Sequence, residues 1–309
     1  MTSIVEVATY VPGQVRLADH TAAVGLSSVE LRRYERAFGY STVAYAADQT
    51  ETDILMGAAG KLQGLAGCED RVRYVLRPRT VRWPSPYPLS ALHEVREELG
   101  LGHAQAFALT EQACAGGLLA IDTAGALLRD DGDPDALALV LIGEKTAPNV
   151  AEFIPGMAVL GEATAAVLVA ADGVRDRVLG YSASVLPVAD SGLTLDPEAV
   201  KAFGAIYGDG LTAVIGGALS VAGLRPRDLA LYLPHNVGRR LCLTTGAALG
   251  LSEDQVVTDT ISENAHCWGA DPFVNYQVAR QLGRLAPGDR YLMTSVGLGA
   301  TFAAMVLEH

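Results

Sequence analysis

The chain has 309 residues, half of them hydrophobic and only 19% charged, and its formal net charge is -12. This composition suits a compact α/β protein with one large core or two domains of about 150 residues. The acidic balance argues against nucleic-acid binding, which depends on clustered Lys and Arg. The apolar runs are shorter than the roughly 18–20 residues of a membrane span, and the N-terminus has no leader pattern. We therefore expect a cytoplasmic protein whose partners include neither nucleic acid nor membrane.

The first half of the chain alternates predicted strands and helices. Short apolar stretches predict strands, and apolar residues at helical spacing predict helices. Strands are expected over 4–10, 73–76, 106–109 and 137–143, and after a glycine turn within 161–170. Helices are expected over 27–39, 52–65 and 90–99, and directly after residue 114. The segment 77–88 is rich in Arg and Pro and is expected to be a loop.

The second half repeats this alternation after a polar turn near residue 172. Strands are expected over 178–185, 229–233, 291–295 and 302–307, and helices over 211–222, 239–250 and 274–285. Each half begins with a strand and ends in a glycine turn followed by an apolar strand. We interpret this as a duplicated α/β unit with halves 1–172 and 173–309, whose sheets stack with helices between and around them in α-β-α-β-α layers.

Cys114 lies in the segment T-E-Q-A-C-A-G-G, where a predicted strand gives way to a helix. The free N–H groups and the dipole of a helix N-terminus would stabilise a thiolate there, which is the setting of a nucleophile. The alternative is that Cys114 is a small buried apolar residue. The four cysteines are widely scattered, which favours reduced thiols, and their spacing does not indicate a metal site.

Several turns of the chain together resemble those of the thiolase superfamily, most of all 3-oxoacyl-acyl carrier protein synthase III. The motifs are A-C-A-G-G around Cys114, G-E-A-T-A-A-V from residue 161, P-H-N-V-G from 234 and G-L-G-A-T from 297. The resemblance implies that Cys114 accepts an acyl group from a thioester. It also implies an oxyanion hole formed by backbone N–H groups of Cys114 and of the glycine turn at Leu298 and Gly299.

The resemblance implies partners as well as a fold. The acyl donor would be a phosphopantetheine thioester, on an acyl carrier protein or on coenzyme A, with no further cofactor, and the protein would be a homodimer. Arg240, with Arg239 beside it, matches a position that contacts the carrier protein, although a solvated helix face would show the same pattern. Arg32 and Arg33 lie where coenzyme A-binding members have a Trp and an Arg, so the choice of donor stays open.

The residues opposite the cysteine depart from the condensing pattern. Condensing members use a histidine, matched by His235, and an asparagine in a G-N-T-S segment that E-N-A-H-C-W-G-A-D replaces here. Asn264 is a candidate for a displaced equivalent. The pair His266 and Asp271 instead resembles the H-x-x-x-x-D pattern of synthase III-like acyltransferases, in which the carboxylate would fix a general-base imidazole. Asp271 could also cap the helix that begins near Pro272.

Three hypotheses follow for the function. The leading one is an acyltransferase of secondary metabolism that passes the acyl group from Cys114 to a hydroxyl or amine of a small molecule, with His266 and Asp271 as base and partner. His235 would assist, and Asn236 would either orient it or cap the next helix. The first alternative is a decarboxylative condensing enzyme that uses His235 and Asn264. The second is a non-catalytic ketosynthase-like partner subunit.

Overall fold

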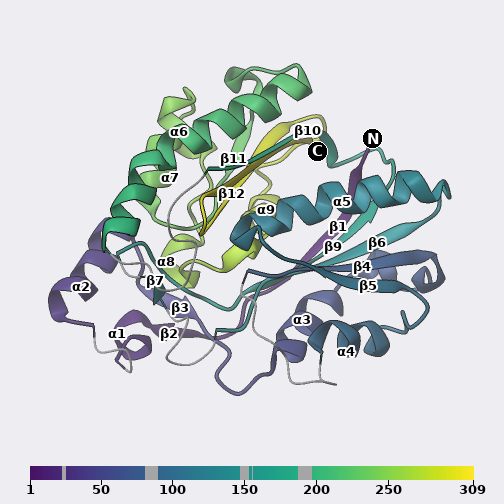
Figure 1. Ribbon diagram of the computed structural model, residues 1–309, viewed down its shortest axis with the longest axis horizontal. Helices are drawn as coiled ribbons and strands as arrows, with labels where there is room; N and C mark the ends of the chain where they lie inside the picture. Colours follow the sequence, from purple (N-terminus) through teal and green to yellow (C-terminus); the bar gives the residue numbers. More distant parts are fainter. Residues whose placement is uncertain (23–25, 81–89, 147–152, 155, 187–196) are drawn as a thin grey trace.

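A nine-stranded mixed sheet, ordered β11-β12-β13-β10-β1-β9-β6-β4-β5, organises the molecule (Figure 1). The computed structural model describes residues 1–22, 26–80, 90–146, 153–154, 156–186 and 197–309. The strands of the main sheet are β1 Ser3–Tyr10, β4 Val72–Pro78, β5 Gln105–Leu109, β6 Leu137–Ile142, β9 Thr164–Ala170, β10 Arg177–Val185, β11 Leu231–Leu233, β12 Arg290–Gly297 and β13 Thr301–Glu308. Two small ribbons pair β2 Gln14–Arg16 with β3 Thr42–Ala44, and β7 Phe153–Ile154 with β8 Ala158–Val159.

The described residues also form nine α-helices and several short helical turns. The α-helices are α1 Leu17–His20, α2 Ser28–Arg33, α3 Glu51–Ala59, α4 Ala91–Glu98, α5 Gly116–Asp131, α6 Pro197–Ala222, α7 Arg239–Ala248, α8 Ile261–Asn264 and α9 Asp271–Gln281. The turns are the π-helical η1 Tyr34–Phe38 and the 3-10 turns η2 Gln63–Leu65, η3 Glu69–Arg71, η4 Ala113–Ala115, η5 Pro226–Asp228, η6 Glu253–Gln255 and η7 Trp268–Ala270.

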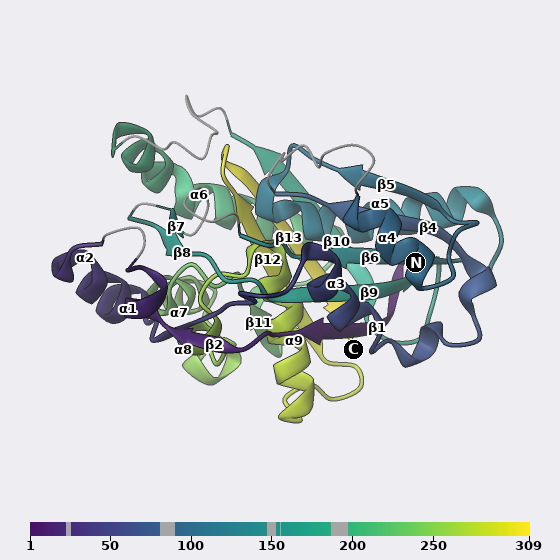
Figure 2. The ribbon, with the colours of Figure 1, turned by 90° about the horizontal axis from the view of Figure 1, so that it is seen from below.

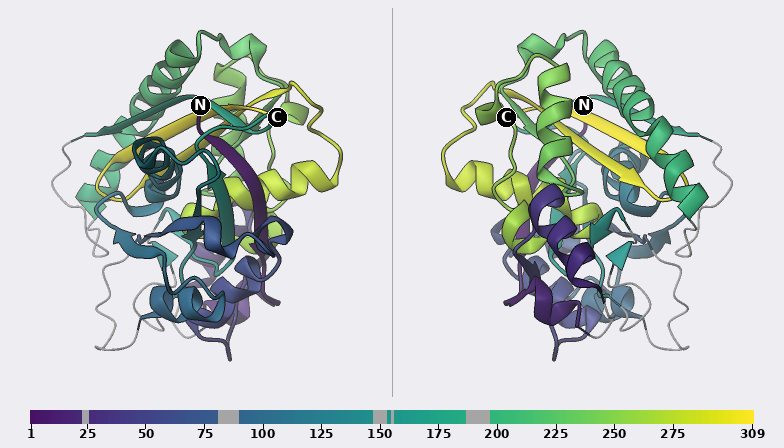
Figure 3. Two further views of the ribbon diagram at one scale, coloured as in Figure 1. Left: turned by 90° about the vertical axis from the view of Figure 1, so that its right-hand side faces the viewer. Right: turned by 90° about the vertical axis from the view of Figure 1, so that its left-hand side faces the viewer.

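The helices form three layers that enclose two parts of the sheet. Helices α3 and α4 pack with β4, β6 and β9 on one outer face, and α6 and α7 pack with β11, β12 and β13 on the other. Helices α5 and α9 share a core with the inner faces of both parts. Figures 1 and 3 show α6 on one side of the molecule and α3 and α4 on the opposite side. The predicted layered α-β-α-β-α fold is confirmed.

The two parts of the sheet have the same strand order and meet at β1. From the junction outward, β1-β9-β6-β4 corresponds to β10-β13-β12-β11, with the first three strands antiparallel neighbours and the last pair parallel. Strand β5 extends the first part by one more strand, parallel to β4. A single residue pair, Ser3 opposite Arg177, joins β1 to β10. This is the duplication that the sequence pattern indicates; the boundary between residues 172 and 173 stays a prediction.

Burial on both faces explains why β6 is a continuous apolar run. Leu139 and Leu141 face the layer of α3 and α4, whereas Val140 and Ile142 face α5 and the central core. All six residues of β6 are buried. A strand covered by helices on both sides has no polar face and cannot show period-two alternation.

Helix α6 is longer than the sequence pattern predicts, because it begins at Pro197 rather than near residue 211. Its first half contains glycines, which lower helix propensity. Gly210 lies against the ring of Phe302, where a Cβ would come within 2.7 Å of a ring carbon, so close packing on β13 accounts for this glycine. Length and hydropathy alone would let α6 cross a membrane. That is weak evidence, because a helix packed on a sheet, as α6 is, meets the same criteria.

Smaller departures concern the ends of other elements. The predicted helix over 27–39 divides into α2 and η1, which ends at Gly39 with a φ of 88°. Helices α1 and α2 lie at one end of the molecule beside α7 (Figure 2). Strand β4 runs on to Pro78, so the expected loop starts later than residue 77. The part of that loop from residue 81 onward lies outside the described residues.

Candidate active site

Cys114 sits in η4, the turn between β5 and α5, and is 3% exposed. The backbone reaches it through Glu111 and Ala113, whose φ values are 74° and 45°. Such left-handed conformations are costly for residues other than glycine and are concentrated at functional sites. They bring the thiol close to the N-terminus of the 16-residue helix α5, where free N–H groups stabilise negative charge. The Thr80 hydroxyl lies 4.0 Å from Sγ of Cys114.

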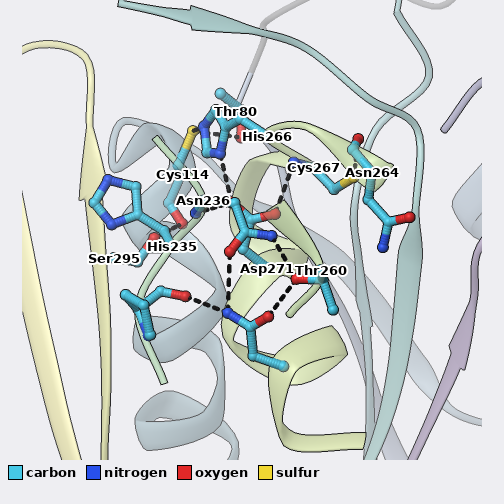
Figure 4. Close-up of polar contacts among 12 residues, drawn as sticks. Thr80, Cys114, His235, Asn236, Thr260, Asn264, His266, Cys267, Asp271 and Ser295 are labelled. Atoms are coloured by element: carbon cyan, nitrogen blue, oxygen red, sulfur yellow. Dashed lines mark hydrogen bonds and ion pairs between the residues drawn. The ribbon is translucent and has the colours of Figure 1, made fainter. Parts of the chain in front are cut away.

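His266 and Asp271 form a line with Cys114 (Figure 4). The Sγ atom of Cys114 lies 3.6 Å from Nε2 of His266. On the other side of the ring, Nδ1 of His266 lies 2.5 Å from Oδ2 of Asp271. All three side chains are buried. The five-residue spacing of the pair is bridged by η7, so the local turn itself brings the carboxylate to the imidazole.

Glycines permit the close approach of the two halves at this point. A Cβ on Gly269 in η7 would lie 2.9 Å from the carbonyl oxygen of Cys114, and a Cβ on Gly117 in α5 would lie 3.1 Å from the carbonyl oxygen of Gly269. Any larger residue at Gly269 would push η7 away from η4. The absence of a side chain at Gly117 and Gly269 therefore allows the short distance between Cys114 and His266.

Buried hydrogen bonds hold Asp271 in place. Its Oδ1 accepts from the backbone N–H of Cys267 at 2.7 Å, and its Oδ2 accepts from the backbone N–H of Asn236 at 2.6 Å. The Asn236 amide in turn donates to the Thr260 hydroxyl, which donates to Asn275. Asp271 is the first helical residue of α9, and the N-cap position is occupied by Ala270. The capping alternative is therefore wrong, and the carboxylate serves His266 and two backbone N–H groups.

The pKa values of the two histidines of the site are shifted in opposite directions. Burial alone would lower the pKa of His266, but the charge and the hydrogen bond of Asp271, helped by Cys114, raise it to about 10. Burial lowers the pKa of His235 well below its usual value, and the neighbouring His266 lowers it further. The ring centroids lie 5.8 Å apart. One imidazole is thus basic and the other neutral, a separation that assigns different roles to paired groups.

His235 follows β11 and has a partner that the sequence did not indicate. Its Nε2 lies 3.2 Å from the hydroxyl of Tyr207 on α6. Asn236 does not touch the His235 ring in any described contact; its side chain bonds to Thr260 and Asn275. Tyr207 belongs to no motif, and its helix was not predicted at that position, so no sequence signal pointed to it.

The C-terminal glycine turn lies against the nucleophile. A Cβ on Gly297 would be 3.2 Å from the backbone N of Cys114 and 2.5 Å from the carbonyl oxygen of Gln112. Leu298 packs beside Cys114, and Gly299 has a φ of 86°. The hydroxyl of Ser295, at the end of β12, donates to the carbonyl oxygen of Cys114 at 2.7 Å. The turn is thus in place for the predicted oxyanion donors, and Ser295 is a contact that sequence reasoning missed.

Asn264 is not brought to the thiol. Its Oδ1 accepts a hydrogen bond from the side chain of Gln14 at 3.2 Å, and its carbonyl oxygen accepts from the thiol of Cys267. In Figure 4 its side chain lies on the far side of Cys267 from Cys114. The residue that faces Cys114 from this segment is His266.

An apolar cavity of about 460 Å³ leads to the reactive groups. Cys114, His235, His266, Tyr207 and Leu298 line its inner end. The remaining wall is mainly apolar and comes from α6, α7, η1 and the β7–β8 ribbon: Phe38, Ile154, Met157, Val200, Phe203, Leu211, Ile215, Val237, Leu241, Leu249 and Val296. Among the described residues, no group of three His, Cys, Asp or Glu side chains is placed to hold a metal ion.

The predicted docking arginines lie beside this cavity. Arg239 and Arg240, at the start of α7, line a second hollow of about 500 Å³ together with Arg36 of η1. The two hollows share Thr244. Of the N-terminal arginines, Arg32 lies on α2, as does Arg33, whose guanidinium is close to Gly156. Three arginines and one carboxylate, Glu253, therefore line the second hollow.

Comparison with known proteins finds one family in the C-terminal part of the chain and along most of its length. Residues 219–309 match the family described as 3-oxoacyl-[acyl-carrier-protein] synthase III, C terminal. The beta-ketoacyl-[acyl-carrier-protein] synthase III of Sphingopyxis alaskensis is 26% identical over 287 residues, which cover 85% of this chain and 86% of that protein.

Two solved structures share the fold along nearly the whole chain. The acyltransferase ChlB3 superposes with a TM-score of 0.86 at 20% identity, covering 99% of this chain and 97% of its own. The priming beta-ketosynthase of the R1128 polyketide pathway superposes with a TM-score of 0.82 at 19% identity, covering 100% and 96%.

Proposed function

We propose that this chain, which is similar to 3-oxoacyl-acyl carrier protein synthase III, is an acyltransferase of that family rather than a condensing enzyme. It would take an acyl group from a phosphopantetheine thioester onto Cys114 and pass it to a hydroxyl or amine of a small molecule. The relatives named above are enzymes that use acyl carrier protein thioesters, so an enzyme of this family is the starting point.

The observation that carries the proposal is the line from Cys114 through His266 to Asp271. A buried carboxylate that raises the pKa of an imidazole in contact with the nucleophile equips the site for general-base catalysis. Of the two groups that the condensing alternative needs, Asn264 does not face Cys114, because its side chain bonds to Gln14. The family likeness to ChlB3, a protein described as an acyltransferase, supports the same reading.

Acylation of Cys114 follows from the charge states at the site. A protonated His266 beside Sγ stabilises the thiolate, which attacks the thioester carbonyl of the donor. The new carbon–sulfur bond to Cys114 forms as the bond to the pantetheine sulfur breaks. The proton of His266 passes to the departing thiolate, which leaves as a neutral thiol. Backbone N–H groups of Cys114 and of the turn at Leu298 would stabilise the transient oxyanion.

In the transfer to the acceptor, His266 takes up a proton instead of releasing one. Acylation removes the thiol hydrogen bond and the charge of Cys114, both of which help to raise the pKa of His266. The neutral imidazole then takes the proton of the acceptor hydroxyl or amine as its oxygen or nitrogen bonds to the acyl carbon. The carbon–sulfur bond to Cys114 breaks, and the proton on His266 balances the thiolate that is restored.

The remaining parts of the proposal concern partners and setting. Arg239 and Arg240, with Arg36 beside them, would attract the acidic surface of an acyl carrier protein to the mouth of the cavity. Coenzyme A could supply the same phosphopantetheine arm. We place the protein in the cytoplasm as a homodimer in secondary metabolism, and we propose no cofactor besides the donor's phosphopantetheine arm.

The test is to trap the acyl-enzyme. The protein is incubated with octanoyl-coenzyme A or with S-octanoyl pantetheine and is analysed by peptide mass spectrometry. We expect an octanoyl adduct on Cys114 that is absent from Cys114→Ala and retained in Cys68→Ala, a half-buried thiol at the start of η3, away from the site. An unmodified Cys114 with both donors would contradict the proposal and favour the non-catalytic alternative.

The same preparation tests the condensing alternative, which the names of the curated relatives favour. The octanoyl-enzyme is mixed with malonyl-coenzyme A, and released carbon dioxide is measured. We expect no release above the rate of the Cys114→Ala variant. Carbon dioxide release that is lost in His235→Ala would establish the condensing alternative instead.

A further inference from the structure

Tyr207 is the polar group on α6 that meets the reactive end of the cavity. Its hydroxyl lies 3.2 Å from Nε2 of His235, and its ring makes edge contacts with the stacked rings of Phe203 and Phe302, at centroid distances of 5.8 and 6.1 Å. The ring of Tyr207 therefore packs against apolar rings, and its hydroxyl points to His235. Both residues line the cavity.

Neither member of this pair carries charge at neutral pH. Burial raises the pKa of Tyr207 well above its usual value, and burial lowers the pKa of His235. A neutral imidazole has one N–H and one bare nitrogen, and the hydrogen bond at one nitrogen decides which is which. The Asp271 carboxylate can only accept a hydrogen bond from His266, whereas the Tyr207 hydroxyl can also donate. A phenol hydroxyl donates more readily than it accepts, so Tyr207 favours the tautomer of His235 that leaves Nε2 bare and carries its proton on Nδ1.

His235 and His266 face a common space. Their rings are inclined at 69° with centroids 5.8 Å apart, and both line the inner end of the cavity beside Cys114. A single oxygen or nitrogen atom placed between two imidazoles at this separation is within hydrogen-bond reach of both. An acceptor that reaches His266 and the acyl carbon on Cys114 enters the cavity that His235 also lines.

We propose that Tyr207 is a positioning residue that locks His235 in one neutral tautomer, so that His235 hydrogen-bonds the nucleophilic hydroxyl or amine of the acceptor while His266 removes its proton. The inference rests on the proposed acyl transfer and adds a second contact to it. It also narrows the acceptor class to groups that can make two hydrogen bonds at once, one to each imidazole.

The test separates the two half-reactions in Tyr207→Phe, which keeps the ring and removes the hydroxyl. Octanoyl-enzyme is prepared with octanoyl-coenzyme A and isolated, and its decay is followed against butanol and butylamine concentration. We expect octanoylation of Cys114 at the wild-type rate. We expect decay in the presence of butanol or butylamine to slow about tenfold, as loss of one buried hydrogen-bonding position implies. The matched control is Tyr232→Phe, which removes a buried hydroxyl bonded to Thr294 outside the cavity.

A spectroscopic measurement tests the positioning role without any acceptor. In protein with 15N-labelled histidine, we expect His235 to show a single neutral tautomer in the wild type and in Tyr232→Phe, and a mixture in Tyr207→Phe. An unchanged tautomer in Tyr207→Phe, or decay equal to that of the wild type, would overturn the inference while the acyl-enzyme itself still supports acyl transfer. A wild-type protein that forms no acyl-Cys114 would instead contradict the proposed function.

Discussion

At the scale of single residues, the site is governed by the partner of each imidazole. Asp271 makes His266 a strong base. His235, whose partner is the uncharged Tyr207, stays neutral, although both rings line the same cavity. The spacing of His266 and Asp271 was readable from the sequence because a local turn, η7, connects them. The pairing of Tyr207 with His235 was not, because it joins a helix to a loop through packing that no local pattern encodes.

Asp271→Asn is expected to weaken the base. Loss of the carboxylate charge leaves burial to lower the pKa of His266, so acyl transfer from a preformed octanoyl-enzyme should slow about 100-fold, the lower end of general-base contributions. Single-turnover decay of the octanoyl-enzyme in butanol measures this rate. Asp259→Asn, which breaks a surface ion pair with Arg284, is the matched control and should transfer normally.

The same variant has a pH signature in stability. Because folding raises the pKa of His266 to about 10, its protonation stabilises the native state fully below the unfolded value near 6.5, and this contribution is lost as pH rises through 10. Urea unfolding at pH 6, 8 and 10 should therefore show the largest gap between wild type and Asp271→Asn at pH 6. A gap that widens toward pH 10 would contradict the pairing.

At the scale of elements, close contacts between turns set the geometry around the nucleophile. Sequence patterns located the strands of the main sheet and most helices, because apolar spacing and glycine turns are local signals, but they missed the short strands β2, β3, β7 and β8. They could not give the contacts of η4 with η7 and with the end of β12, since those segments are far apart in the chain. They also missed the first half of α6, where packing on β13 outweighs a glycine-rich sequence.

Gly297→Ala is expected to displace the turn that carries the predicted oxyanion donors. The added Cβ would meet the carbonyl oxygen of Gln112 at 2.5 Å and lie 3.2 Å from the backbone N of Cys114. We expect octanoylation of Cys114 to slow at least about tenfold, and the free energy of unfolding to fall by about 1–3 kcal/mol. Mass spectrometry over time and urea titration measure the two effects.

Gly216→Ala provides the comparison, since an added Cβ on this face of α6 meets no atom within 4 Å. It should leave octanoylation unchanged and raise the free energy of unfolding by roughly 1 kcal/mol through helix propensity. Equal octanoylation rates in the two glycine variants would mean that the turn at Gly297 does not support the reaction.

At the scale of the whole molecule, charge is distributed unevenly. The chain has a net charge of -12, yet Arg36, Arg239 and Arg240 surround one hollow beside the cavity. A local cationic patch on an acidic protein steers an acidic partner toward one face.

Arg240→Glu is expected to impair use of carrier-bound donor selectively. The reversal of charge should raise KM for an octanoyl-acyl carrier protein about tenfold and leave KM for S-octanoyl pantetheine unchanged, because the small donor needs no docking surface. Arg227→Glu, an exposed arginine in η5, should behave as wild type with both donors. Equal effects of Arg240→Glu on both donors would place Arg240 in the cavity chemistry instead.

The contact of Gly117 and Gly269 makes catalysis a joint property of the two halves of the chain. Cys114 comes from the part before residue 172, and His235, His266 and Asp271 come from the part after it, so neither half carries a complete site. Recombination between relatives near residue 172 would therefore disable the enzyme wherever the contacts between the two halves at the site are mismatched. An active chimaera would need both halves of the site, Cys114 from one and His266 from the other, to come from chains whose contacts match.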